Sequence, residues 1–232
     1  FVPELLVVSN PLWETTLLFD SLPEQVQVQE QGLFPFLSDA VAVREDTGGS
    51  AANVAVHAAQ WGFEVAQVGR TGTDIFSEQA RKRLLSYGVH DALVEEDGRR
   101  LKTSAIVRKR GVDKGYFCAW IPERAVTPVR WEDIPEGWVS SAKWVHLDRV
   151  SELGLHIARA RFEAGLGTSL DLHICPHRPA AQKRLEAILP CVDLVQLSAS
   201  AMESLCSRRN FPAQPEALLP HLYRPGQWLT VT

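Results

Sequence analysis

Residues 47–55 of this chain read TGGSAANVA and stand directly before a segment, 51–61, whose apolar residues recur at helical spacing. Adjacent glycines let a backbone come close to a ligand, and the free N–H groups at a helix start bind polar or anionic groups. Asn53 adds an amide that both donates and accepts hydrogen bonds. A glycine turn followed by a helix cap explains the same stretch equally well, so the surrounding sequence has to decide.

Outward from this stretch, short apolar runs alternate with helical segments. The runs are continuous rather than alternating, which is typical of parallel strands buried on both faces, and they cover residues 5–9, 65–69, 144–147, 168–172, 194–197 and 228–231. The helical spacing covers residues 51–61, 75–87, 153–164, 179–189 and 199–206. This alternation predicts an α/β fold with a mostly parallel sheet and helices on both faces.

Two segments interrupt the alternation, at approximately 15–45 and 100–125. Each contains a pair of short strand patterns with partly polar faces, at 15–20 and 40–44 and at 103–108 and 116–120. We expect them to form a small sheet apart from the main one.

Composition narrows the function classes. The chain has 232 residues, 45% of them hydrophobic and 22% charged, which is typical of a globular protein. A net charge of −4 argues against a nucleic-acid partner, and no apolar run approaches the roughly 18 residues of a membrane-spanning helix. Four scattered cysteines indicate a reducing compartment, so we expect a cytoplasmic protein.

The segment after the first helix carries a resemblance to a known family. Trp61-Gly62 is followed by VGRTGTDIFS at 68–77, a second helix and YGV at 87–89. With GGSAANVA, this order and spacing resembles the ribokinase-like (PfkB-type) carbohydrate kinases, whose signature reads GG-x-x-x-N-x-A and then VGxxGxDxFG. Thr73 and Ser77 are small departures. The resemblance implies a ribokinase-like doubly wound, mostly parallel sheet with a small β-sheet lid. It also implies that residues 1–232 form one such domain, incomplete at its C-terminus.

The resemblance implies an ATP- and Mg²⁺-dependent kinase that phosphorylates a hydroxyl of a sugar or nucleoside. It implies that the lid closes over the substrate and forms a homodimer contact. The residues that match substrate-binding positions of the family are Glu14, Gly48, Gly49, Asn53 and Asp148. Glu14 replaces the aspartate usual at its position and is one methylene longer. The family's catalytic base lies in a GAGD-type segment, which we expect beyond Thr232.

Residues 192–201 depart from the family where it handles magnesium and phosphate. They read VDLVQLSASA and align with the family's VDIxxxNxxE, so Ser198 replaces the asparagine and Ala201 the glutamate. Ser198 still offers a hydroxyl to the cofactor, whereas alanine offers no oxygen. An alternative is therefore a catalytically inactive, sugar-binding pseudokinase of the same fold.

Other features support weaker hypotheses. His173, Cys175 and His177 share one face of an extended segment and are zinc-ligand types, although Pro176 interrupts that geometry. Trp13 and Phe117 are candidates to pack against a sugar ring. No nucleotide-binding P-loop or dinucleotide fingerprint occurs.

Overall fold

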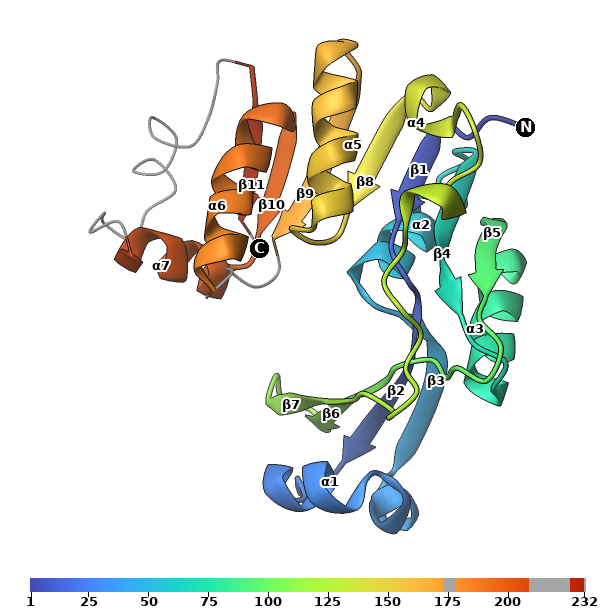
Figure 1. Cartoon of the computed structure of the whole chain (residues 1–232). Coiled ribbons are helices and arrows are strands. Elements are labelled where there is room, and N and C mark those ends of the chain that lie inside the picture. The colour runs from blue at the N-terminus through green and yellow to red at the C-terminus, as the bar shows by residue number, and fades with distance from the viewer. Residues whose placement is uncertain (173–177, 209–225, 232) are drawn as a thin grey trace.

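The computed structural model describes residues 1–172, 178–208 and 226–231 of the chain. In these residues the chain forms an α/β fold with two separate sheets (Figure 1). The main sheet is parallel throughout, in the order β11-β10-β9-β8-β1-β4-β5. Its strands, in chain order, are β1 (Leu5–Val8), β4 (Val65–Thr71), β5 (His90–Glu95), β8 (Trp144–Leu147), β9 (Gly167–Leu172), β10 (Leu194–Leu197) and β11 (Trp228–Val231).

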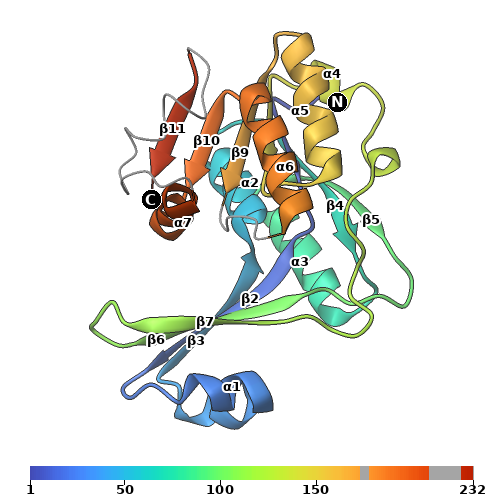
Figure 2. The same cartoon turned by 60° about the vertical axis from the view of Figure 1, so that its left-hand side comes forward.

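The smaller sheet, which we call the lid sheet, has the order β3-β2-β6-β7. Its strands are β2 (Leu12–Phe19), β3 (Ala42–Gly48), β6 (Thr103–Lys109) and β7 (Gly115–Trp120). The outer pairs are antiparallel, but the central pair, β2 with β6, is parallel. β2 follows β1 after only three residues, Ser9 to Pro11, so the lid sheet lies at the carboxyl ends of the main-sheet strands (Figures 1 and 2).

The helices cover the two faces of the main sheet unequally. Those on the main sheet are α2 (Ser50–Gln60), α3 (Ile75–Ser86), α4 (Trp138–Ser141), α5 (Glu152–Glu163), α6 (Pro179–Ile188) and α7 (Ala199–Arg208), whereas α1 (Gln25–Gln31) packs beside the lid sheet (Figures 1 and 2). Leu6 and Val8 point to the face where α4 to α7 bury the larger core. Val7 points to the other face, where α2 and α3 form a second core with small residues such as Ala55. Alternate residues of a strand thus serve both cores, which explains the continuous apolar runs.

A buried ion cluster fixes the loop that crosses from the lid sheet back to β8. Arg70, at the end of β4, pairs with Asp133 at 2.6 Å and with Glu96 at 2.7 Å, and donates to the Thr127 hydroxyl at 2.7 Å. Asn10 joins the same region, since its side chain accepts from the Arg70 amide and donates to the Thr127 carbonyl. The segment between β1 and β2 is therefore held rigidly where the site residues begin.

Most expected elements form within one or two residues of their predicted bounds, whereas several short elements were not expected. The edge strand β5 was missed because its sequence, HDALVE, has only three consecutive apolar residues between polar ones and buries only Leu93. Helix α1 and a 3₁₀ helix, Phe34–Asp39, lie in the Gln/Glu/Pro-rich part of the first lid segment, and α4 is only one turn long. Within the described residues, no helix is both long and apolar enough to cross a membrane.

Candidate functional site

The predicted substrate residues converge in part on a hollow of about 440 Å³ between the lid sheet and α2, which we call the lid hollow. Its walls come from β2, β3 and β6 on one side and from α2 and Tyr87 on the other. They comprise Glu14, Thr16, Arg44, Asp46, Thr47, Asn53, Val56, His57, Gln60, Tyr87, Ile106 and Arg108. Glu14 and Asn53 therefore face the same space, although 39 positions separate them in the sequence (53 minus 14).

Glu14 has few partners in this hollow. Its carboxylate accepts one long hydrogen bond, 3.5 Å, from the Ser104 hydroxyl on the neighbouring strand β6. Burial raises the pKa of Glu14, while the Ser104 hydrogen bond and the charge of Arg108 oppose that rise. Most of the hydrogen-bonding capacity of this half-buried carboxylate is thus available to a ligand with hydroxyl groups.

The two glycines of the GGSAAN stretch have different reasons to be glycine. A Cβ atom on Gly48 would stand 2.7 Å from the Cβ of Glu14, so the missing side chain makes room for Glu14 itself. Gly49 has φ +89° and precedes the first residue of α2, a backbone conformation that disfavours other residues. In this structure the glycine pair positions Glu14 and the start of the helix.

Asn53 lies in the first turn of α2 and is exposed. Its side-chain amide makes no hydrogen bond with residues 1–172, 178–208 or 226–231, while it borders two hollows. The second hollow, about 1150 Å³, lies over β8 to β10 on the α2 face of the main sheet and is mostly apolar, with Trp61, Phe63, Trp144 and Leu170 in its walls. A free amide at this boundary is well placed to bind a ligand in the lid hollow.

Asp46, which the sequence did not single out, anchors the far wall of the lid hollow. Its carboxylate accepts from the Tyr87 hydroxyl at 2.6 Å and from the Thr47 amide at 2.8 Å. The hydrogen bond to Asp46, together with burial, raises the pKa of Tyr87. Period-two spacing back from Gly48 would have found both Asp46 and Arg44, because alternate residues of a strand share a face.

Asp148 is placed apart from the other predicted residues. It follows β8 and borders a separate hollow of about 210 Å³ with Ser9 and Asn10. Its carboxylate accepts from the Ser9 hydroxyl at 2.6 Å and from the Arg149 guanidinium through two bonds of 3.0 Å. Only 11% of the Asp148 side chain is exposed, so most of its capacity is used within the protein.

Ser198 and Ala201 mark the other predicted part of the site, where β10 gives way to α7. The Ser198 hydroxyl accepts a hydrogen bond of 3.1 Å from the Ala201 amide, the usual role of a serine before a helix. Ala201 is 2% exposed and belongs to the large core. The position where the family carries a glutamate is therefore filled here by an apolar residue packed inside the protein.

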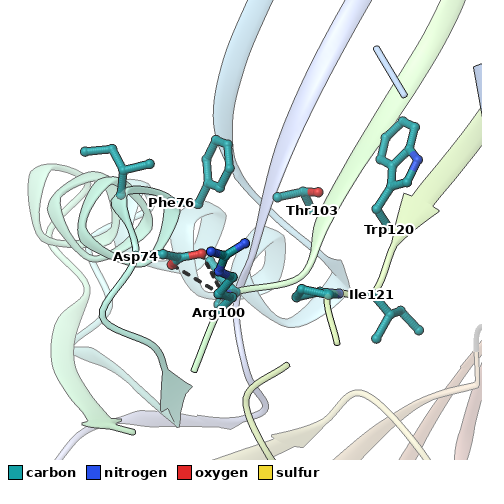
Figure 3. A pocket seen from close by; sticks show the side chains of 9 residues that line it. Asp74, Phe76, Arg100, Thr103, Trp120 and Ile121 are labelled. Atoms are coloured by element: carbon teal, nitrogen blue, oxygen red, sulfur yellow. Dashed lines mark hydrogen bonds between the residues drawn. The ribbon is translucent and has the colours of Figure 1, made fainter. Parts of the chain in front are cut away.

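A further hollow, about 360 Å³, lies between the start of α3 and strands β6 and β7 (Figure 3). Asp74, the last residue of the TGTD stretch at 71–74, borders it. The Asp74 carboxylate caps α3 by accepting from the Ser77 amide at 3.0 Å, and it also accepts from the Leu101 amide at 3.2 Å (Figure 3). The motif aspartate thus joins α3 to the strand entering the lid sheet and has a structural role.

The remaining candidates divide by strand face. Trp13 is 5% exposed and packs with Ala80, Leu101 and Val126, on the face of β2 opposite to Glu14. Phe117 is 53% exposed and pairs with Ile106, whose side chain borders the lid hollow. Trp13 is therefore wrong as a contact in the lid hollow, while Phe117 stays a prediction.

The predicted zinc ligands His173, Cys175 and His177 lie outside the described residues. Among the described residues, no group of three or more His, Cys, Asp or Glu side chains is arranged to hold a metal ion.

An α/β sheet with a separate lid sheet at its strand ends, and polar side chains facing the space between them, defines the ribokinase-like class of fold. The chain belongs to the pfkB family of carbohydrate kinases, whose family model matches residues 16–231. No curated protein matches it in sequence.

Solved structures share the fold at low identity. An ATP-bound fructokinase from Xylella fastidiosa aligns with a TM-score of 0.73 and 22% identity over 100% of this chain and 69% of that chain. An adenosine kinase from Anopheles gambiae, in complex with P1,P4-di(adenosine-5) tetraphosphate, aligns with a TM-score of 0.70 and 19% identity over 90% of this chain and 69% of that chain. A ribokinase from Arabidopsis thaliana, complexed with ribose and ATP, aligns with a TM-score of 0.63 and 18% identity over 89% of this chain and 64% of that chain.

Proposed function

We propose that this protein is an ATP-dependent kinase that transfers a phosphoryl group to a hydroxyl of a sugar or nucleoside. The observation that carries the proposal is the lid hollow, in which the Glu14 carboxylate and the Asn53 amide face the same space with little to bind inside the protein. Carboxylates and amides are the groups that recognise polyhydroxylated ligands, because together they accept and donate hydrogen bonds. Membership of the pfkB family supplies the reaction type.

The chain's own residues have separate tasks in this proposal. Glu14 accepts hydrogen bonds from acceptor hydroxyls, and Asn53 binds a further hydroxyl from the opposite wall. Gly48 keeps Glu14 in position. The lid sheet forms one wall, and its closure over the acceptor would exclude water and hold the reacting hydroxyl in place, which is the main contribution a kinase makes to phosphoryl transfer.

ATP is proposed as the phosphoryl donor, because the fructokinase and the plant ribokinase were both solved with ATP. Magnesium has less support in this chain. Ser198 accepts from the Ala201 amide and pairs with the Ser200 hydroxyl, and the buried Ala201 offers no ligand oxygen, so this position lacks the carboxylate that a magnesium shell favours. We therefore assign no step to a metal ion.

A second candidate function, acceptor binding without transfer, is favoured by that same position. A buried alanine where the family has glutamate removes a metal-handling group but leaves Glu14 and Asn53 unaffected. A binding protein of this kind would recognise the sugar or nucleoside and form no phosphorylated product.

The two candidates are separated by measuring transfer and binding together. The purified protein is incubated with magnesium-ATP and a panel of sugars and nucleosides, and ADP and phosphorylated products are quantified by mass spectrometry. Thermal stabilisation by the same compounds is measured without nucleotide. Product formation supports the kinase, whereas stabilisation without product for every compound supports the binding protein.

Variants tie either activity to the lid hollow. Asn53→Ala should abolish stabilisation by the acceptor, while Gln29→Ala, an exposed position on α1, should leave it unchanged. Unaltered acceptor binding by Asn53→Ala would show that the acceptor lies elsewhere.

A further inference from the structure

Two arginines flank the outer part of the lid hollow. In the lid sheet, Arg44 of β3 pairs with Thr16 of β2, and Arg108 of β6 pairs with Leu18. Thr16 and Leu18 follow Glu14 at two-residue steps, so all these side chains share the face that borders the hollow. Two positive charges thus stand beyond Glu14, one on each side of β2, and both arginines border the hollow.

The protein itself does not neutralise these charges well. Arg44 approaches Asp46 at 3.8 Å, but its side chain is 79% exposed and Asp46 already accepts from Tyr87 and Thr47. Within the described ranges, no hydrogen bond or salt bridge joins the Arg108 guanidinium to another residue. Nearby Arg110, in contrast, pairs with Asp20 at 2.8 Å. Arg108 is therefore an available guanidinium that points into a site.

The wall between the two ends of the hollow is less polar. Ile106 lies between Ser104 and Arg108 on the same face of β6, and Val56 of α2 contributes a second apolar side chain. A ligand that lies along this wall contacts hydrogen-bonding groups at one end, at Glu14 and Asn53. It then contacts the apolar side chains of the wall and, at the other end, the guanidinium group of Arg108. A neutral sugar or nucleoside offers these guanidinium groups no opposite charge, whereas an anionic group does.

We propose that the acceptor carries an anionic group, a carboxylate or a phosphate, which Arg108 binds with help from Arg44 at the end of the hollow remote from Glu14. The guanidinium fork fits both groups, since each presents two oxygens that accept parallel N–H bonds. The inference rests on the proposed function, because it concerns the acceptor of that same site, and it narrows the acceptor to acidic or phosphorylated sugars.

The test compares neutral and anionic forms of one carbon skeleton. Calorimetric titration of the complete protein, without nucleotide, uses glucose, gluconate and glucose 6-phosphate, and fructose with fructose 6-phosphate. We expect an anionic member to bind at least about tenfold more tightly than its neutral counterpart, as for a charge-assisted bidentate pair. The advantage should shrink as sodium chloride rises. Gluconate against the sugar phosphates distinguishes a carboxylate from a phosphate.

Variants locate the effect. Arg108→Gln should remove most of the tenfold advantage of the anionic member over its neutral counterpart, and Arg44→Gln should remove less. Lys109→Gln is the matched control, because it deletes the same charge one residue along β6, on the opposite face. Arg108 is exposed, so its variant should keep the wild-type melting temperature.

Several results would overturn the inference. These are equal or weaker binding of every anionic member, an advantage that survives Arg108→Gln, or equal binding of inorganic phosphate by wild type and Arg108→Gln while sugar phosphates show no preference. Transfer to a neutral acceptor, with no tighter binding of any anionic one, would also overturn it while the kinase stands. Arg108-dependent anion binding without any transfer would support it while the kinase fails.

Discussion

Glu14 and Asp148 are two carboxylates predicted to bind the acceptor, and their surroundings differ. Asp148 accepts three hydrogen bonds of 2.6 to 3.0 Å from Ser9 and Arg149. Glu14 accepts one of 3.5 Å, and burial raises its pKa. The difference shows that an acidic residue at a strand end becomes a binding group only when the protein leaves its oxygens unsatisfied. We therefore expect Asp148 to act mainly on stability and Glu14 mainly on acceptor binding.

The largest expected effect is on the Asp148 side of this comparison. Asp148→Ala leaves the buried Ser9 hydroxyl and the Arg149 guanidinium without their acceptor, which should lower the free energy of unfolding by about 2–3 kcal/mol. Urea denaturation measures the loss. Asp148→Asn, which keeps an acceptor oxygen, should lose less. A variant of wild-type stability that no longer binds the acceptor would reverse the roles given to the two carboxylates.

The next effect tests the fit of Glu14 against Gly48. Gly48→Ala forces a new Cβ to within 2.7 Å of Glu14, and we expect a loss of about 2 kcal/mol in the free energy of unfolding, as for overpacking. Glu14→Gly removes the atom that clashes. The double variant should therefore be more stable than the sum of the two single losses predicts. Strict additivity in this cycle would mean that the two residues do not press on one another.

A smaller effect is expected from Glu14 on binding. Glu14→Gln keeps the shape but removes the charge, so the acceptor should bind about tenfold more weakly, the value of one charge-assisted hydrogen bond. The free energy of unfolding should change little, in contrast with Asp148→Ala. Calorimetric titration checks the affinity, and Glu30→Gln, on exposed α1, serves as the control. Equal affinity of Glu14→Gln and wild type would remove Glu14 from the site.

The smallest effect is a pH dependence of stability that comes from Glu14. Because the folded-state pKa of Glu14 is raised by burial, the folded protein binds the proton more tightly than the unfolded chain does. The stability of wild type relative to Glu14→Gln should therefore be greatest below the unfolded pKa of about 4.3 and fall as pH rises through the folded pKa. Asp46, Arg108 and Ser104 face the same carboxylate. Melting curves of both proteins from pH 4 to 7 measure the difference, and parallel curves would refute it.

Much of the fold was predictable, because the strands of the main sheet are apolar on both faces, and because GGSAAN and TGTD each lie between a strand and a helix. The hydrogen-bond partners of each site residue were not predictable. Ser9 donates a hydrogen bond to Asp148 although 139 positions separate the two residues, and the sequence around neither residue indicates this contact. Arg108 was missed because a charged residue near the end of a strand usually faces solvent. Only the pairing of β6 with β2 puts it on the same face as Glu14.

That pairing has a consequence for how the molecule folds. β2 and β6 are parallel, and the pair Glu14–Ser104 spans 90 positions that include α2, β4, α3 and β5. Closing a loop of this length is slow relative to forming the local hairpin of β6 and β7. Within the lid sheet, the β6–β7 hairpin should therefore form before β2 pairs with β6, and the space that holds Glu14, Ile106 and Arg108 together should appear only after that pairing.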